Sequence, residues 1–139
     1  MKGSYVLLIK LPEEQIITIG SLKALHFPSG GYAYVGSALN GFKTRIRRHL
    51  TSNKKLHWHI DYLLEKASIT GVILYETNDR AECTIAQALE HQFDSIPGFG
   101  CSDCRCRSHL FFADENQMES NITATLKSQG MRPKLERIA

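Results

Sequence analysis

The chain has 139 residues, of which 42% are hydrophobic and 22% are charged, and its formal net charge is +3. This size and composition fit a single domain, residues 1–139, with one core, and they exclude a disordered chain. No apolar run approaches the roughly 18 residues that a membrane-spanning helix needs. We therefore expect a cytoplasmic protein without a membrane partner.

The first quarter of the chain has the pattern of short strands separated by turns. Residues 4–11, "SYVLLIKL", predict a strand that is apolar on both faces, and the acidic "PEE" after it does not fit a signal-peptide cleavage site. β-Branched residues favour a second strand at 15–20, and a third ends at Phe27 before the turn "PSGG". With "YAYVGS", residues 32–37, the pattern predicts an antiparallel meander.

The next stretch combines helical periodicity with positive charge. Phe42, Ile46 and Leu50 recur every four residues and predict the buried stripe of a helix at about 41–50. Residues 41–55 contain six basic residues and no acid; these are Lys43, Arg45, Arg47, Arg48, Lys54 and Lys55. Such a patch suits a phosphate backbone, although charge runs are also common on solvated helix faces.

The remaining elements alternate between helices and strands. We expect them at about residues 54–66 (helix), 68–77 (strand), 80–93 (helix), 108–113 (strand) and 115–129 (helix). Asn78 and Asp79 would cap the helix at 80–93, and Gly130 would end the last one. The sequence thus predicts an α/β domain, a small and mostly antiparallel sheet flanked by helices.

Seven residues in this framework follow a distinctive order. They are Gly3 and Tyr5 in the first strand, Tyr34 and Gly36 in a later strand, Arg45 and His49 on the basic helix, and Glu82 on the third helix. This order resembles the GIY-YIG nuclease superfamily, and "YVGSALNGFKTRIRRHL" is especially close to its second half-motif. Within the superfamily, "KKLHWHIDYLL" and "GFGCSDCRCRSHLFF" resemble an uncharacterised branch, domain of unknown function family 123. Members of that branch occur alone or fused to endonuclease III-type glycosylases.

The resemblance implies a phosphodiester hydrolase with one divalent ion. Tyr5 corresponds to the general base and Tyr34 to the second active-site tyrosine. Arg45 corresponds to the residue that neutralises the phosphate, and His49 would orient a tyrosine hydroxyl or contact phosphate. Glu82 corresponds to the ligand of the metal, for which Mg²⁺ or Mn²⁺ is suited. The fold would be GIY-YIG-like with an extra hairpin at about residues 13–29.

The resemblance also implies a nucleic-acid substrate. DNA is favoured over RNA, and a base-excision glycosylase is suggested as a partner, because the branch is associated with such repair enzymes. The residues expected to contact the nucleic acid are Lys43, Arg47, Arg48, Lys54, Lys55 and His57. Nothing in the sequence sets the oligomeric state. We therefore expect a DNA endonuclease with a role in DNA repair.

Each of these residues also has a structural interpretation. Tyr5 and Tyr34 could be ordinary strand residues, and Tyr32 is a rival for the second active-site tyrosine because it shares a sheet face with Tyr34. Asp79 and Glu82 also fit a capping box, with Asp79 as N-cap. If Glu82 only caps its helix, the alternative is a non-catalytic nucleic-acid-binding module of the same fold.

A third hypothesis comes from the cysteines. The run "CSDCRCRSH" holds Cys101, Cys104, Cys106 and His109, four ligands of the type that bind zinc. Zinc knuckles usually divide their ligands into two separated pairs, which this run does not. A tight loop with partly buried cysteines is therefore the favoured interpretation, and a small zinc-binding interaction domain remains the alternative.

Overall fold

The computed structural model describes residues 2–20, 22–51, 54–100, 105–113 and 115–138. The strands in these residues are β1 (Gly3–Leu11), β2 (Gln15–Thr18), β3 (Ala24–Phe27), β4 (Gly30–Ala38), β5 (Ser68–Glu76), β6 (Asp94–Ser95), β7 (Leu110–Ala113) and β8 (Lys134–Arg137). The helices are α1 (Phe42–Leu50), α2 (His59–Leu64), α3 (Glu82–Glu90) and α4 (Glu115–Ser128).

Six strands form one antiparallel sheet in the order β6-β7-β4-β1-β5-β8. β1 lies inside the sheet and pairs with β4 on one side and β5 on the other, which explains its continuous apolar sequence. β2 and β3 pair only with each other. The predicted α/β class, the antiparallel sheet and the extra hairpin are confirmed. The predicted meander is wrong, because the hairpin leaves the sheet and β4 pairs directly with β1.

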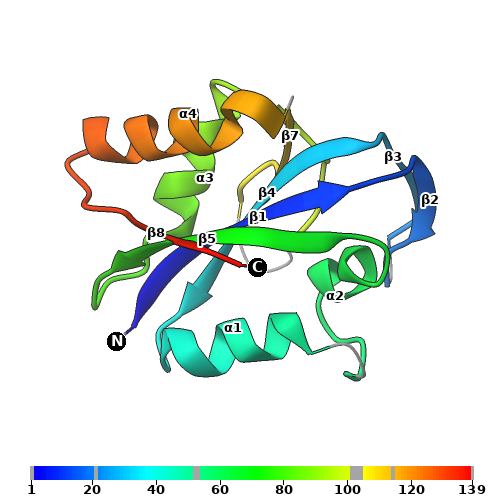
Figure 1. Ribbon diagram of the computed structural model, residues 1–139, viewed down its shortest axis with the longest axis horizontal. Helices are drawn as coiled ribbons and strands as arrows, with labels where there is room; N and C mark the ends of the chain where they lie inside the picture. The colour runs from blue at the N-terminus through cyan, green and yellow to red at the C-terminus, as the bar shows by residue number, and fades with distance from the viewer. Residues whose placement is uncertain (1, 21, 52–53, 101–104, 114, 139) are drawn as a thin grey trace.

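Helices cover both faces of the sheet (Figure 1). Because successive side chains of a strand point to opposite faces, Tyr5 and Leu7 of β1 belong to one buried cluster while Val6 and Leu8 belong to another. The first cluster includes buried residues of α1, α2 and the hairpin, and the second includes those of α3 and α4. The domain therefore has three layers, with α1 and α2 on the face that carries Tyr5.

The predicted start of α2 and the predicted buried stripe of α1 need correction. α2 begins at His59 instead of residue 54, because the Asp61 carboxylate accepts hydrogen bonds from the backbone N–H groups of His57 and Trp58 and holds them in a turn. On α1, Leu50 is 47% exposed whereas His49 is 3% exposed. The last turn of α1 therefore buries a histidine against the sheet and leaves the leucine in solvent.

The C-terminal half follows the predicted order with two additions. β7 begins at Leu110 because the Ser108 hydroxyl accepts a hydrogen bond from the Leu110 N–H and keeps the preceding residues in a turn. α4 ends at Ser128, and Gly130 adopts a left-handed φ of 81°, as predicted for a helix terminus. The sequence did not predict the short β6 or the polar edge strand β8. No helix in the described part of the chain is long and apolar enough to cross a membrane.

Candidate active site

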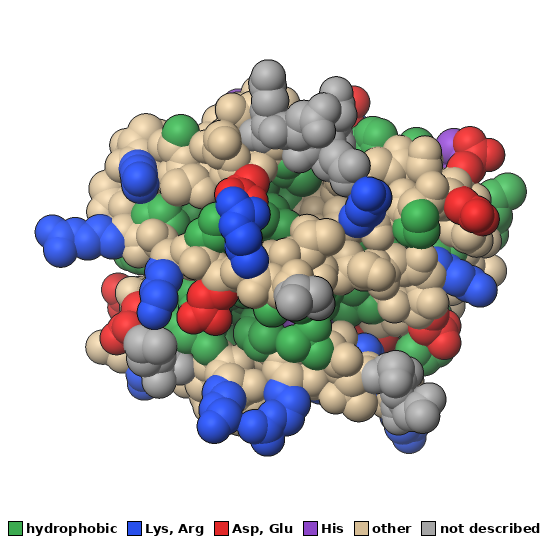
Figure 2. Space-filling model, viewed as in Figure 1, with side chains coloured by type: hydrophobic (Ala, Val, Ile, Leu, Met, Phe, Trp, Pro, Cys, Tyr) green, Lys and Arg blue, Asp and Glu red, His purple; other side chains and the backbone are tan. Residues whose placement is uncertain are grey.

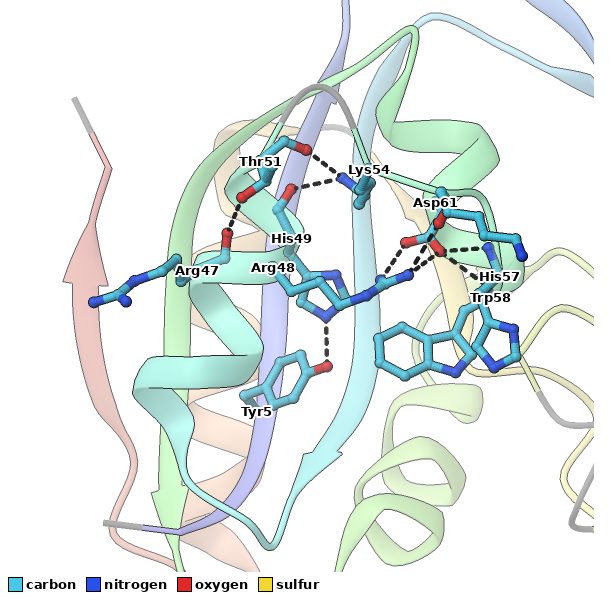
Figure 3. Close-up of polar contacts among 10 residues, drawn as sticks. Tyr5, Arg47, Arg48, His49, Thr51, Lys54, His57, Trp58 and Asp61 are labelled. Carbon is cyan, nitrogen blue, oxygen red and sulfur yellow. Dashed lines mark hydrogen bonds and ion pairs between the residues drawn. The ribbon is translucent and has the colours of Figure 1, made fainter.

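Tyr5 and His49 form the buried centre of the candidate site. The Tyr5 hydroxyl lies 2.6 Å from His49 Nε2, and the two side chains come from β1 and α1 (Figure 3). Burial lowers the pKa of His49 to about 4, so its ring is neutral at pH 7 and Nε2 accepts the hydrogen bond from Tyr5. Burial also raises the pKa of Tyr5 far above its ordinary value, so Tyr5 keeps its proton. His49 Nδ1 is buried and has no hydrogen-bond partner within the described part of the chain.

Gly36 makes room for the Tyr5 ring. β1 and β4 pair so that Tyr5 lies opposite Gly36, and a Cβ atom at Gly36 would come within 2.4 Å of the Tyr5 ring and its hydroxyl. A side chain at position 36 would therefore displace Tyr5 from His49. Gly3 is similarly constrained, because a Cβ there would lie 2.0 Å from the Tyr75 carbonyl oxygen. Close packing therefore explains why positions 3 and 36 are both glycine.

Tyr34, and not Tyr32, is the second tyrosine at this centre. The ring of Tyr34 meets His49 edge to face at 6.3 Å between centroids. Burial raises the pKa of Tyr34 to about 12. The Tyr32 hydroxyl donates a hydrogen bond of 2.6 Å to the Pro28 carbonyl, which commits it to the turn between β3 and β4. The structure therefore removes Tyr32 as a rival.

Two arginines of α1 lie against the Trp58 ring. The guanidinium carbons of Arg45 and Arg48 are 4.5 Å and 4.0 Å from the ring centroid. Such contacts stabilise a cation by about 0.5 to 2 kcal/mol, depending on how far it is desolvated. The charge of Arg45 opposes the effect of burial on the pKa values of both Tyr5 and Tyr34. Arg45 is therefore close enough to this centre to influence negative charge there.

Arg48 is also paired with Asp61. Its guanidinium donates two hydrogen bonds, of 2.8 and 2.9 Å, to the fully buried Asp61 carboxylate. Although burial disfavours the charged carboxylate, Arg48 and the two backbone N–H groups hold the pKa of Asp61 at about 2. The Lys54 ammonium donates to the carbonyl oxygens of His49 and Thr51 (Figure 3). These two predicted nucleic-acid contacts thus secure the end of α1.

The other predicted contact residues extend into solvent. Lys43 and Arg47 are exposed on α1, and Lys55 and His57 are exposed between α1 and α2. Of the six predicted contacts, these four are the ones whose side chains are available to a phosphate backbone.

Glu82 lies on a second wall of the site. A pocket of about 300 Å³ is lined by Tyr34, Val35, Gly36, Ser37, Arg80, Glu82, Cys83, Gly100 and His109. β7 pairs with Gly31–Tyr34 of β4, the Val35 N–H donates to the His109 carbonyl just before β7, and the start of α3 lies beside this part of β4. Glu82 Oε2 is buried and, among the residues that the structure describes, has no hydrogen-bond partner.

The predicted capping box is wrong. α3 begins at Glu82 with Ala81 as N-cap and no side-chain cap, while the Asp79 N–H donates to the Thr77 hydroxyl in a separate turn. Glu82 therefore points into the pocket without capping its helix. A buried carboxylate oxygen without a partner is costly unless a cation or donor satisfies it. The Glu82 carboxylate, with water molecules as the remaining ligands, could hold one hard divalent ion.

A family model described as "Domain of unknown function DUF123" matches residues 4–131. The chain belongs to this family. A comparison with curated proteins and another with solved structures found no match.

The DUF123 chain brings a second donor group close to the same pocket. The ligand atoms of Cys83, Cys106 and His109 all lie within 4.8 Å of one another, so the group could hold a metal ion. Of the cluster predicted from the sequence, Cys106 and His109 belong to this group, while Cys101 and Cys104 lie outside the described residues.

Two residues of the site, Cys83 and Asp61, are not among those predicted from the sequence. Cys83 lies far from the other three cysteines in the chain, although it adjoins Glu82. The Asp61 carboxylate binds Arg48. The sequence shows Asp61 as an acid just after a basic segment. Which basic residue it pairs with depends on the three-dimensional packing.

Proposed function

We propose that this DUF123 chain hydrolyses phosphodiester bonds of nucleic acid, with DNA as the favoured substrate, as a GIY-YIG-type endonuclease. The observation that carries the proposal is the position of Glu82. Its buried and unpartnered carboxylate oxygen lines the pocket that Tyr34 and Gly36 also line, and Gly36 is the residue on which the Tyr5 ring packs. In this proposal one phosphate binds between Glu82 and Tyr34, with Tyr5 packed behind Gly36 and Arg45 acting on both tyrosines.

The Tyr5–His49 pair supports a proton relay. A free phenolate is unfavourable at Tyr5 because burial raises its pKa. Tyr5 can still take a proton from an attacking water if its own proton passes to His49 Nε2 at the same time. The new bond joins the water oxygen to phosphorus while the bond from phosphorus to the leaving alkoxide breaks. The water proton passes to Tyr5 and the Tyr5 proton to His49, and the alkoxide takes a proton from solvent. Tyr5 can therefore act as the general base only if His49 accepts its proton.

Substrate charge would make His49 a better acceptor. Burial lowers the pKa of His49 first, and the nearby cations Arg45, Lys54 and Arg48 lower it further. A bound phosphate places negative charge among these cations, which raises the histidine pKa toward its ordinary value. The relay is therefore expected to become competent when nucleic acid binds.

The metal in this proposal is one divalent ion. Glu82 would hold it, and Mg²⁺ or Mn²⁺, when bound, would polarise the scissile phosphate and stabilise the leaving oxygen. Arg45 would neutralise the charge that develops on the phosphate, since its guanidinium already lies over Trp58 close to both tyrosines.

The basic face of α1 supports a nucleic-acid substrate. Lys and Arg side chains project along the lower edge of the molecule in Figure 2, where Figure 1 shows α1. Lys43 and Arg47 are exposed on this helix, and Lys55 and His57 continue the surface beyond it. Exposed cations on and beyond the helix that carries Arg45 and His49 favour a polyanion that is held outside while one phosphate enters the site.

The test is cleavage of labelled nicked, flapped and branched DNA with Mg²⁺ or Mn²⁺. We expect Tyr5→Phe to lower the rate by about 10²- to 10⁴-fold, the usual contribution of a catalytic acid or base. We expect Glu82→Gln to lower it by at least as much, because this variant loses the carboxylate that would hold the divalent ion. The chain offers matched controls. Glu90→Gln removes an exposed carboxylate from the same helix, and Tyr32→Phe removes a buried hydroxyl that is bonded outside the site.

Three results would decide the matter. Loss of cleavage in the two site variants, with both controls active, supports the proposal. Equal cleavage by all variants contradicts it and indicates another nuclease in the preparation. Absence of cleavage with salt-sensitive DNA binding would instead identify a non-catalytic binding module of the same fold.

A further inference from the structure

Three soft donor groups from separate parts of the chain meet beside α3. Cys83 is the second residue of α3, Cys106 lies in the segment that leads to β7, and His109 directly precedes β7. Their ligand atoms lie within 4.8 Å of one another, and Cys83 Sγ is 3.9 Å from His109 Nε2. Cys83 and His109 also line the pocket that contains Glu82.

We propose that Cys83, Cys106 and His109 bind one structural zinc ion, distinct from the ion assigned to Glu82. In tetrahedral zinc sites, with Zn–S near 2.3 Å and Zn–N near 2.05 Å, a sulfur and a nitrogen ligand are about 3.6 Å apart. The observed separation of 3.9 Å between Cys83 Sγ and His109 Nε2 needs only a small adjustment. A water or a further side chain supplies the fourth ligand.

The donor chemistry separates this site from the neighbouring one. Thiolates and imidazole select zinc over magnesium or calcium, whereas a carboxylate with waters selects the hard ions. Glu82 and Cys83 are adjacent in sequence, so the start of α3 would present a hard ligand to the nuclease pocket and a soft ligand to the zinc. Two metals of different type can therefore occupy neighbouring positions without competing.

The backbone around His109 suits a fixed ligand. The His109 N–H donates to the Phe99 carbonyl at 2.9 Å, and the His109 carbonyl accepts from the Val35 N–H at 2.9 Å. His109 is also 5% exposed, so its ring has little freedom to turn away. One ligand is thus held by the sheet before any metal binds.

Zinc would connect this fixed point to the first turn of α3. That turn has no side-chain cap to help fix its position. A metal bond from Cys83 would stabilise the turn and, with it, the direction of the Glu82 carboxylate. The zinc is therefore a structural element that positions Glu82 without contacting the substrate.

The first experiment is metal analysis of untagged wild-type protein, purified under reducing conditions without chelator. We expect about one zinc per chain by mass spectrometry, and most of it lost in Cys83→Ser and Cys106→Ser. His91→Asn is the matched control, because His91 is an exposed histidine at the end of the same helix. Cys83→Ser is decisive, since a site made only from the contiguous "CSDCRCRSH" run would not need Cys83.

A second measurement avoids variants that might not fold. Zinc should protect Cys83 and Cys106 of the native protein from alkylation, and a chelator should expose both at the same rate. Cobalt in place of zinc should give the charge-transfer absorption of thiolate ligands. The proposal is overturned if folded wild-type protein takes up no zinc, or if folded Cys83→Ser keeps all of it.

The outcome does not depend on nuclease activity. The Glu82→Gln variant should keep its zinc even if it cleaves no DNA, because Glu82 is not a zinc ligand here. Failure of the nuclease proposal would therefore leave the zinc result interpretable, and the reverse also holds.

Discussion

The Tyr5 hydroxyl and His49 Nε2 lie 2.6 Å apart although 44 residues separate them in the chain. Both side chains are almost completely buried, so each would lose most of its polar contacts if the other were removed. Gly36 permits this arrangement, because only a residue without a side chain leaves space for the Tyr5 ring over β4. The pair thus couples the first strand to the last turn of α1.

We expect a double-mutant cycle to show an interaction between Tyr5 and His49 in the free energy of unfolding. Tyr5→Phe leaves the buried His49 Nε2 without a partner, which costs about 1 to 3 kcal/mol. The same change should cost less in a His49→Leu background, giving a coupling energy of about 1 kcal/mol. Denaturant unfolding of the four proteins measures it. A parallel cycle with Tyr32→Phe should be additive within about 0.5 kcal/mol, and equal coupling in both cycles would argue against a specific bond.

His49 should also make stability depend on pH. Its pKa is lowered by burial to about 4 from the ordinary value of 6.5. Between these values the unfolded chain binds a proton that the folded chain does not, so the free energy of unfolding rises with pH over this window. The difference corresponds to about 3 kcal/mol, and it is lost as pH falls from about 6.5 to 4. Unfolding of wild type and His49→Leu from pH 4 to 7 would check this, since the variant should have a flatter profile.

The elements that could be predicted from sequence depend on local patterns. The apolar run of β1, the position of α1 and the Gly130 terminus each follow from neighbouring residues, and the structure agrees with them. Of the predicted buried stripe of α1, Phe42 is buried, whereas Leu50 is exposed. The order of tyrosines, arginine and glutamate was also sufficient to select residues that meet in space. Tyr5 and Tyr34 both contact His49, although the hairpin of β2 and β3 lies between them in the chain.

The errors concern contacts that local patterns do not contain. The length of α2 was overestimated because the Asp61 carboxylate holds two backbone N–H groups before the helix, which propensity does not reveal. The Asp79–Glu82 spacing fitted a capping box, but the turn at Thr77 delays the helix start to Glu82. Cys83 joins Cys106 and His109 only because α3 and β7 approach each other in the fold.

Asp61 should contribute strongly to stability at neutral pH. Asp61→Asn removes the buried carboxylate that Arg48 and two backbone N–H groups contact, and we expect a loss of about 2 to 3 kcal/mol at pH 7. Because the folded pKa of Asp61 is about 2 and its ordinary value is 3.8, this contribution is present above pH 4 and disappears as pH falls through that interval. Unfolding curves at pH 7 and pH 2.5 should therefore differ less between variant and wild type at the lower pH. An unchanged difference would contradict this assignment.

Gly36→Ala should disturb both stability and the site. The new Cβ would meet the Tyr5 ring at 2.4 Å, so Tyr5 or β4 must move, at a cost of about 1 to 3 kcal/mol or more. The nuclease activity that we propose should fall with it, because the Tyr5–His49 bond lengthens. Gly130→Ala is the matched control, because no atom lies within 4 Å of the new Cβ. Its only expected cost is the strain of a left-handed backbone at alanine, about 1 kcal/mol. Thermal unfolding and cleavage rates should therefore separate the two variants.

The basic residues should divide into two classes with different measurable effects. Lys43→Ala and Arg47→Ala remove exposed charges, so we expect weaker DNA binding, a salt slope reduced by about one per residue, and stability within about 0.5 kcal/mol of wild type. Arg48→Ala should instead lower stability by about 3 kcal/mol, because it leaves the buried Asp61 carboxylate without its cation. Binding titrations at several salt concentrations, together with denaturant unfolding, distinguish the classes. Lys23→Ala, on the exposed hairpin, controls for a general loss of positive charge. If it weakened binding as much as Arg47→Ala, the contact surface would not be centred on α1.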